Sequence, residues 1–367
     1  MHTSMNINTV YPPRQERRVQ VIALHCSGAG ASQWAVLAEV LGERYEMLAP
    51  EHYGSESSGP WTGEHVFTLA DEAMRAIALI DKCENKVHLV GHSYGGGVAL
   101  RVALARPRRI ASMALYEPSA FHLLRQMGER GAEAYSEIAG VARRTTDGVL
   151  NGDYHGAISN FVDYWNGPGT WDAMKPAVQN ALIRWAPKGP LDFRALIDEP
   201  TPANAYRRLN FPVLIMRGEH APKPARVIAE RLSELLPISR LMVIEGAGHM
   251  GPLTHAHEVS ALITRHISDT EADTQPRWWH PRSSTKGTAA GEGDVMNLYR
   301  ARDLADLTDA TSRADYDGAE RWTIIMTASR NSFAQSPPNH VRAIFLIYAK
   351  TTAALARVDC RRTPRKI

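Results

Sequence analysis

Six short apolar runs alternate with longer segments of helical periodicity, and this alternation constrains the fold more than any other feature. The runs cover residues 19–25, 45–50, 86–91, 110–117, 211–218 and 240–246, and helices are expected over residues 69–83, 94–105, 224–236 and 255–267. Such alternation is typical of a parallel sheet that helices cover on both faces. The sequence therefore predicts an α/β fold.

The alternation stops between residues 119 and 209. That region contains helix-like segments, Gly-Pro turns and many aromatic residues, and no convincing strand. We therefore expect a helical cap, inserted after the strand at 110–117 and lying over the carboxyl ends of the strands. Residues 1–118 and 210–270 would form the core.

Residues 271–367 form a C-terminal extension of a different character. Pro, Gly, Ser and Thr are frequent at 275–294, which is typical of a linker. A helix is expected over 294–307 and an apolar run spans 341–349. Either a small accessory unit or a poorly ordered extension fits this pattern.

The chain's formal net charge is +3. The excess of basic residues falls in this extension, so the main body provides no electrostatic argument for binding nucleic acid.

Cysteine usage and the two ends of the chain bear on its compartment. Cys26, Cys83 and Cys360 are odd in number and widely spaced, which argues against a disulfide framework or a structural zinc site. The first 18 residues lack the apolar stretch of a signal peptide, and the run at 341–349 is too short to cross a bilayer. We expect a cytoplasmic protein with no membrane partner.

The segment GHSYGG, residues 91–96, follows an expected strand and opens an expected helix. This G-x-S-x-G pattern between strand and helix is typical of a nucleophile elbow, in which Ser93 projects its hydroxyl above the edge of the sheet. Gly91 and Gly95 would supply the room that the tight turn needs. We expect His92 to pack beside the elbow.

Two further Gly-rich turns follow strands. HCSGAGASQW, residues 25–34, lacks the third Gly of a dinucleotide-binding loop and the Gly-Lys-Ser/Thr of a phosphate loop. EGAGHM, residues 245–250, places His249 directly after the last expected strand. A Ser nucleophile needs such an imidazole to take its proton. We expect His255 and His257 to lie at the surface of the following helix.

These three turns, in this order, resemble the α/β-hydrolase superfamily over residues 19–268. The resemblance implies Ser93 as nucleophile and His249 as base, with Ser27 and Tyr94 supplying the backbone N–H groups of the oxyanion hole. Cys26 stands where the family usually has Gly, and we interpret it as a packed small residue. The resemblance also gives Glu51 a structural role in its turn.

The sequence offers two candidates for the acid that would orient His249. The family usually places an Asp in the turn after the strand at 211–218, but Ala221 occupies that position. Some haloalkane dehalogenases take the acid from the strand that follows the nucleophile, which here ends at Glu117. We prefer Glu117, because a strand end holds a carboxylate rigidly, and keep Glu219 as the reserve.

The cap is rich in aromatic residues, and Phe161, Trp165 and Trp185 are candidates for substrate binding. Collectively they favour an apolar pocket and a small-molecule substrate such as an apolar ester. The alternative is that most of them form the core of the cap itself.

A Ser nucleophile excludes the chemistries that need an Asp at the elbow and leaves acyl transfer to water. Hydrolysis of a carboxylic ester through an acyl-enzyme is the first hypothesis. A lactonase or a C–C bond hydrolase would use the same residues. The missing Asp also suits a non-catalytic member of the fold that binds a small ligand. No metal or organic cofactor is implied.

Overall fold

The computed structural model describes residues 18–55, 57–272 and 299–300. Its strands form one parallel sheet in the order β2-β1-β3-β4-β5-β6-β7. The strands are β1 (Val19–Leu24), β2 (Tyr45–Leu48), β3 (Val87–His92), β4 (Ile110–Tyr116), β5 (Val213–Gly218), β6 (Ser239–Ile244) and β7 (Tyr299–Arg300). Each of the six expected strands is present, with its bounds shifted by two residues at most.

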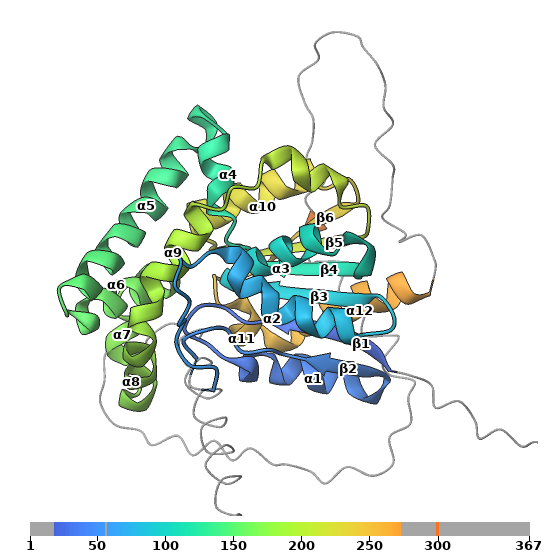
Figure 1. The fold of residues 1–367 in the computed structure, drawn as a ribbon, viewed down its shortest axis with the longest axis horizontal. Coiled ribbons are helices and arrows are strands. Elements are labelled where there is room, and N and C mark those ends of the chain that lie inside the picture. Colours follow the sequence, from blue (N-terminus) through green and yellow to red (C-terminus); the bar gives the residue numbers. More distant parts are fainter. Residues whose placement is uncertain (1–17, 56, 273–298, 301–367) are drawn as a thin grey trace, which may run out of the picture.

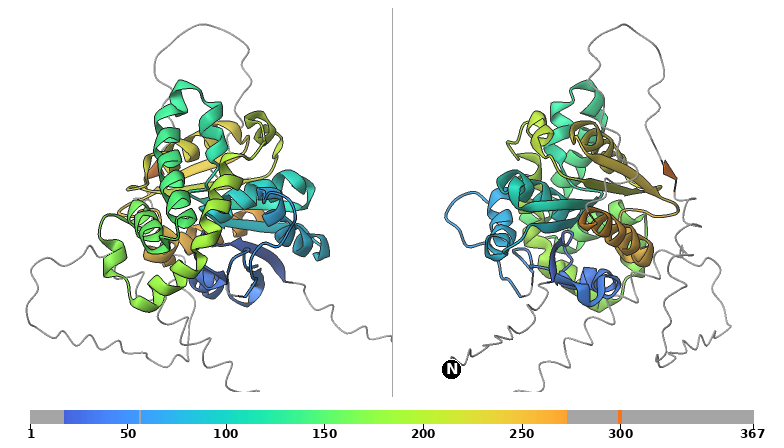
Figure 2. Two further views of the ribbon diagram at one scale, coloured as in Figure 1. Left: turned by 60° about the vertical axis from the view of Figure 1, so that its left-hand side comes forward. Right: turned by 90° about the vertical axis from the view of Figure 1, so that its right-hand side faces the viewer.

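Helices cover both faces of this sheet (Figures 1 and 2). The helices of the core are α1 (Ala35–Leu41), α2 (Leu69–Lys82), α3 (Tyr94–Ala105), α10 (Lys223–Leu235), α11 (Gly251–Thr254) and α12 (Ala256–Glu271). α1 and α12 pack together on one face, while α2, α3 and α10 contribute to the core on the other.

The alternation of side chains along the strands explains these two layers. In β1, Ile22 and Leu24 face the α2–α3 side, whereas Val21 and Ala23 face the α1–α12 side. Successive side chains of a strand point to opposite faces, so a sheet covered on both sides needs apolar residues at nearly every position. Burial of one such aliphatic side chain contributes roughly 1.5–3 kcal/mol.

Between β4 and β5 the chain forms helices and, within residues 119–209, no strand. The helices of this segment, which we call the cap, are α4 (Phe121–Gln126), α5 (Glu129–Leu150), α6 (Tyr154–Asn166), α7 (Thr170–Ala173), α8 (Pro176–Trp185) and α9 (Gly189–Ile197). They lie together beyond one end of the sheet, where the left-hand view of Figure 2 brings them forward. The cap has an apolar core of its own, which includes Trp171, Leu182 and Trp185.

Most of the C-terminal extension lies outside the described residues, including the apolar run at 341–349. Of the helix expected over 294–307, the structure describes Tyr299 and Arg300, and these pair with Met242 and Val243 as β7. The helix prediction is wrong for these two residues. Within the described part of the chain, no helix combines the length and the apolar composition that a bilayer span requires.

Candidate active site

Ser93 lies between the last residue of β3 and the first residue of α3. Its backbone has φ 53° and ψ −117°, a region that side chains with a Cβ rarely adopt. Among the described residues, Ser93 and Glu117 are the two non-glycine positions with positive φ. Strained backbone of this kind persists where the surrounding structure holds it, and it concentrates at functional sites.

Two glycines make the tight turn at Ser93 possible. A Cβ on Gly95 would lie 2.2 Å from the carbonyl oxygen of Leu24, and a Cβ on Gly91 would lie 2.6 Å from that of Gly95. Both distances are far below van der Waals contact with backbone that cannot easily move. α3 therefore packs directly against the end of β1, as the elbow interpretation requires.

His249 follows β6 in the turn formed by residues 246–249, and its side chain is buried. The hydroxyl of Tyr116 donates to the carbonyl oxygen of Gly248 at 2.7 Å. The Nε2 of His92 lies 2.8 Å from the carbonyl oxygen of His249 and donates to it. The ends of β3 and β4 thus hold the backbone of this turn, and His92 packs beside the elbow as expected.

The structure brings the imidazole of His249 into contact with both Ser93 and Glu117. Its Nε2 lies 3.0 Å from Oγ of Ser93, and its Nδ1 lies 2.7 Å from Oε2 of Glu117. A proton on Nδ1 would be donated to the carboxylate, which leaves Nε2 free to accept the proton of the hydroxyl. The other oxygen of Glu117 accepts the backbone N–H of Gly218 at 2.8 Å.

The reserve acid lies elsewhere. Glu219 is exposed, and its Oε2 accepts the backbone N–H of Gly246 at 3.0 Å. Ala221, at the position that usually holds the acid, is buried. The last residue of β5 therefore contributes the N–H of Gly218 to Glu117, and Glu219 in the following turn is directed to Gly246 instead of the imidazole. Glu117, and not Glu219, contacts His249.

The loop after β1 lies beside Ser93. Ser27 and Tyr94 both line the cavity at Ser93, and Tyr94 is the first residue of α3, where backbone N–H groups have no acceptor within the helix. The backbone N–H of Cys26 donates to Gln33 at 3.0 Å, and burial raises the pKa of the Cys26 thiol to about 12. Cys26 is thus a packed thiol. Glu51 accepts the N–H of Ala31 at 2.9 Å and so holds the loop.

Two compartments meet at Ser93 beneath the cap. One contains about 530 Å³ of atom-free space, including space open to solvent, and its walls are largely apolar. The other contains about 280 Å³ and includes a buried carboxylate, that of Asp192. Phe161 and Trp165 line both compartments, and Trp185 lines the smaller one. The three aromatic residues chosen from the sequence therefore line the space around Ser93. Trp185 also belongs to the apolar core of the cap, as Trp171 does.

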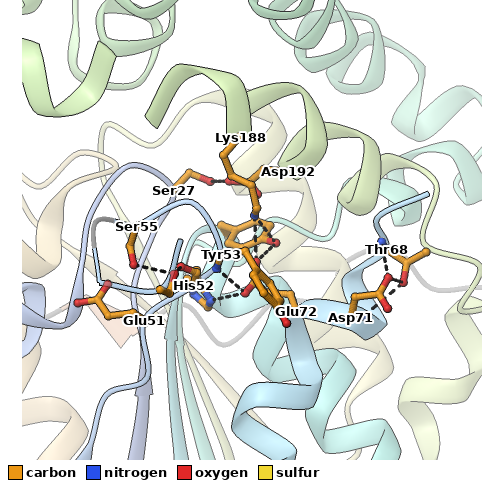
Figure 3. Close-up of polar contacts among 12 residues, drawn as sticks. Ser27, Glu51, His52, Tyr53, Ser55, Thr68, Asp71, Glu72, Lys188 and Asp192 are labelled. Carbon is orange, nitrogen blue, oxygen red and sulfur yellow. Dashed lines mark hydrogen bonds and ion pairs between the residues drawn. The ribbon is translucent and has the colours of Figure 1, made fainter. Parts of the chain in front are cut away.

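Two features of this site were not predicted from the sequence. The hydroxyl of Ser119 lies 3.2 Å from that of Ser93. A buried cluster of Glu72, Lys188 and Asp192 adjoins the loop after β1 (Figure 3). The spacing of Lys188 and Asp192, four residues apart, was visible in the sequence. That spacing is equally typical of ion pairs on an exposed helix face, so it did not indicate burial.

Comparisons with known proteins identify relatives of this chain. A model of a family described as "Alpha/beta hydrolase family" matches residues 21–262. A pimeloyl-[acyl-carrier protein] methyl ester esterase of Aeromonas hydrophila is 26% identical over 261 residues, which cover 67% of this chain and 94% of that protein. The polyketide synthase ThaQ of Burkholderia thailandensis is 27% identical over 267 residues, 70% of this chain but only 12% of that much longer protein.

Solved structures show the same fold. The structure of a hydrolase from Pseudomonas aeruginosa PA01 superposes with a TM-score of 0.54 at 21% identity, covering 68% of this chain and 90% of that one. The fold class expected from the sequence is confirmed.

Proposed function

Because the chain belongs to the alpha/beta hydrolase family, we propose that it cleaves a carboxylic ester through an acyl-enzyme formed on Ser93. The observation that carries this proposal is the continuous set of hydrogen bonds from Ser93 through His249 to Glu117, with distances of 3.0 and 2.7 Å. Ser93 and His249 line a cavity whose walls are mainly apolar, and Glu117 is buried behind the imidazole. Ser, His and Glu in this order of contact form a nucleophile, a base and an acid that orients the base.

In the proposed reaction, Oγ of Ser93 attacks the ester carbonyl carbon while Nε2 of His249 takes the hydroxyl proton. Glu117 stabilises the imidazolium through Nδ1–H. The carbonyl oxygen becomes an oxyanion, which the backbone N–H groups of Ser27 and Tyr94 would stabilise together with the N-terminal dipole of α3. His249 then returns the proton to the leaving alkoxide, and water repeats the sequence on the acyl-enzyme.

The lining of the two compartments supports an apolar ester of moderate size as substrate. The larger compartment is lined by aliphatic and Met side chains from the cap, including Val162, Met174 and Leu182. The curated relative from Aeromonas hydrophila acts on a methyl ester, which supports the same bond type. A lactone is an internal ester, so the same residues would open it by the same steps. A C–C bond hydrolase remains the other enzymatic alternative.

The test is hydrolysis of p-nitrophenyl esters with acyl chains from two to ten carbons, followed by a panel of lactones. We expect release of p-nitrophenol by the wild-type protein and none above background by Ser93→Ala. A folded wild-type protein that hydrolyses no ester and no lactone would overturn the proposal and favour a function in binding a small ligand.

We also propose that turnover does not need the C-terminal extension. The residues that surround Ser93 all lie between 25 and 250. A chain that ends at Ala272 should keep the wild-type kcat for the same esters. Loss of folding in that truncated chain would show that the core extends beyond residue 272.

A further inference from the structure

The amine of Lys188 contacts two buried carboxylates at the junction of cap and core (Figure 3). Lys188 ends a 3₁₀ turn, η4 (Ala186–Lys188), just before α9 of the cap. Its Nζ lies 2.9 Å from Oε2 of Glu72 on α2 of the core and also contacts Oδ1 of Asp192 on α9. The side chains of Lys188, Glu72 and Asp192 are only 4%, 0% and 5% exposed, respectively. Removing three charges from water is costly, so their arrangement must be well compensated.

Each of these carboxylates also holds a side chain from the proposed oxyanion hole. Oδ2 of Asp192 accepts the hydroxyl of Ser27 at 2.7 Å. Oε2 of Glu72 accepts the phenol of Tyr94 at 2.8 Å. Lys188 therefore links the two carboxylates behind both proposed N–H donors, and its Nζ also lies 3.3 Å from the phenol oxygen of Tyr94.

Rigid neighbours fix the core side of this cluster. Glu72 lies in the first turn of α2, which begins with a reciprocal pair of hydrogen bonds between Thr68 and Asp71 (Figure 3). Its second oxygen accepts the backbone N–H of Tyr53 at 3.0 Å. Glu72 is thus held by the start of α2 and by the N–H of Tyr53. Its carboxylate therefore offers the amine of Lys188 one defined position.

Packing also fixes the stem of Lys188. A Cβ on Gly54 would lie 2.9 Å from Cβ of Lys188, so the side chain passes directly over this glycine. Its Nζ lies 4.5 Å from the ring centre of Phe67. The side chain can therefore reach Glu72 only when this part of the cap is seated on the core.

We propose that Lys188 is a positioning residue that couples the seating of the cap to the geometry of the oxyanion hole. The inference rests on the proposed function, because it assigns Ser27 and Tyr94 to that hole. Without the amine, two carboxylates would face each other in a poorly hydrated space and repel, and the side chains of Ser27 and Tyr94 would follow them. Shifts of about 1 Å near the reacting centre can cost about 10²-fold in rate.

The test compares Lys188→Met with Lys223→Met. Lys223, at the start of α10, forms an ion pair with Glu133 on α5 of the cap and thus also joins core to cap, but at a partly exposed position away from Ser93. One readout is the rate at which a fluorophosphonate labels Ser93, which depends on the nucleophile and the oxyanion hole but not on knowing the substrate. The other is kcat and KM for p-nitrophenyl butyrate.

For Lys188→Met we expect labelling rate and kcat to fall by roughly 10- to 100-fold with KM within about twofold of the wild type. Lys223→Met should match the wild type in all three quantities. A Lys188→Met variant that is labelled and turns over at the wild-type rate would overturn the inference. A Lys188→Met variant with a raised KM but wild-type labelling rate and kcat would also overturn it, since that result indicates that Lys188 contacts the substrate.

The two proposals fail separately. Wild-type protein that hydrolyses no ester but is labelled at a rate that depends on Lys188 would end the ester proposal and support this inference. Normal ester hydrolysis with no effect of Lys188→Met would support the ester proposal and overturn the inference about Lys188. Absence of labelling in the wild type would overturn both proposals. If Lys188→Met does not fold, Asp192→Leu removes the acceptor of Ser27 at similar volume. Its labelling should fall at least several-fold, and an unchanged rate would overturn the inference.

Discussion

The indole ring of Trp165 lies against the imidazole of His249, with ring centroids 4.0 Å apart and planes inclined by 27°. Trp165 is on α6 of the cap, whereas His249 belongs to the core, so this contact joins the two parts of the chain at the candidate base. The stack occupies one face of the imidazole and leaves both ring nitrogens free in the plane for Ser93 and Glu117. We infer that Trp165 restricts rotation of the ring.

Replacing Trp165 should therefore affect the chemical step. We expect Trp165→Ala to lower kcat for p-nitrophenyl esters by about 10-fold, because the imidazole gains freedom and its contacts with Ser93 become less populated. Trp165→Phe keeps an aromatic face and should stay within about threefold of the wild type. Steady-state kinetics with both variants measure this. An alanine variant with wild-type kcat and a raised KM would instead assign Trp165 to substrate binding alone.

The acid can be identified by a pair of isosteric substitutions. Glu117→Gln should reduce kcat by about 10³-fold or more, because an amide at this position neither stabilises the imidazolium nor selects its tautomer. Glu219→Gln should remain within about twofold of the wild type, since Glu219 is exposed and its Oε2 accepts the backbone N–H of Gly246. Activity of both variants on one ester decides the matter. Retained turnover in Glu117→Gln together with its loss in Glu219→Gln would reverse the assignment.

A pair of glycine substitutions tests the packing of the elbow. Gly95→Ala places a methyl group 2.2 Å from the carbonyl oxygen of Leu24 and should destabilise the fold by about 3 kcal/mol or more. Gly140→Ala, in the interior of α5, meets only the flexible end of Arg144 at 3.4 Å. Alanine is the better helix former by about 1 kcal/mol, so this control should be neutral or stabilising. Urea unfolding measures both. Equal midpoints for the two variants would show that α3 does not depend on this close approach.

Acid should destabilise the protein through its buried histidines. Burial lowers the pKa of His122 from 6.5 to about 4, and its Nε2 lies 3.0 Å from the hydroxyl of Tyr206. Between pH 6.5 and pH 4 the unfolded chain takes up a proton here that the folded chain does not. The free energy of unfolding therefore falls as the pH decreases through this window and levels off below pH 4.

The variant His122→Gln removes this titration. Its loss of unfolding free energy between pH 7 and pH 4.5 should be smaller than that of the wild type by about 2 kcal/mol. Urea titrations at the two pH values provide the comparison. His52 and His266 have pKa values lowered to about 4 by burial as well, so part of the acid sensitivity should remain in the variant. Identical pH dependence in variant and wild type would contradict the prediction.

Local patterns determined much of this protein. The order of strands and helices follows from apolar runs and helical periodicity, because parallel strands that are buried on both faces need nearly continuous apolar residues. The position of Ser93 follows from glycines two residues to either side of it, at which no Cβ fits. His249 was identified in the same way, from a Gly-rich turn directly after a strand.

Only the tertiary structure decided which carboxylate meets His249. Glu117 and Glu219 both follow the last residue of a strand, and the sequence contains neither the distance between those strand ends nor the directions of the side chains. The same holds for Lys188, whose ion pair with Asp192 could have lain on an exposed helix face. Its burial depends on Glu72, which approaches from a helix more than a hundred residues earlier in the chain. Contacts between such distant residues depend on how the layers pack, and local periodicity does not encode that packing.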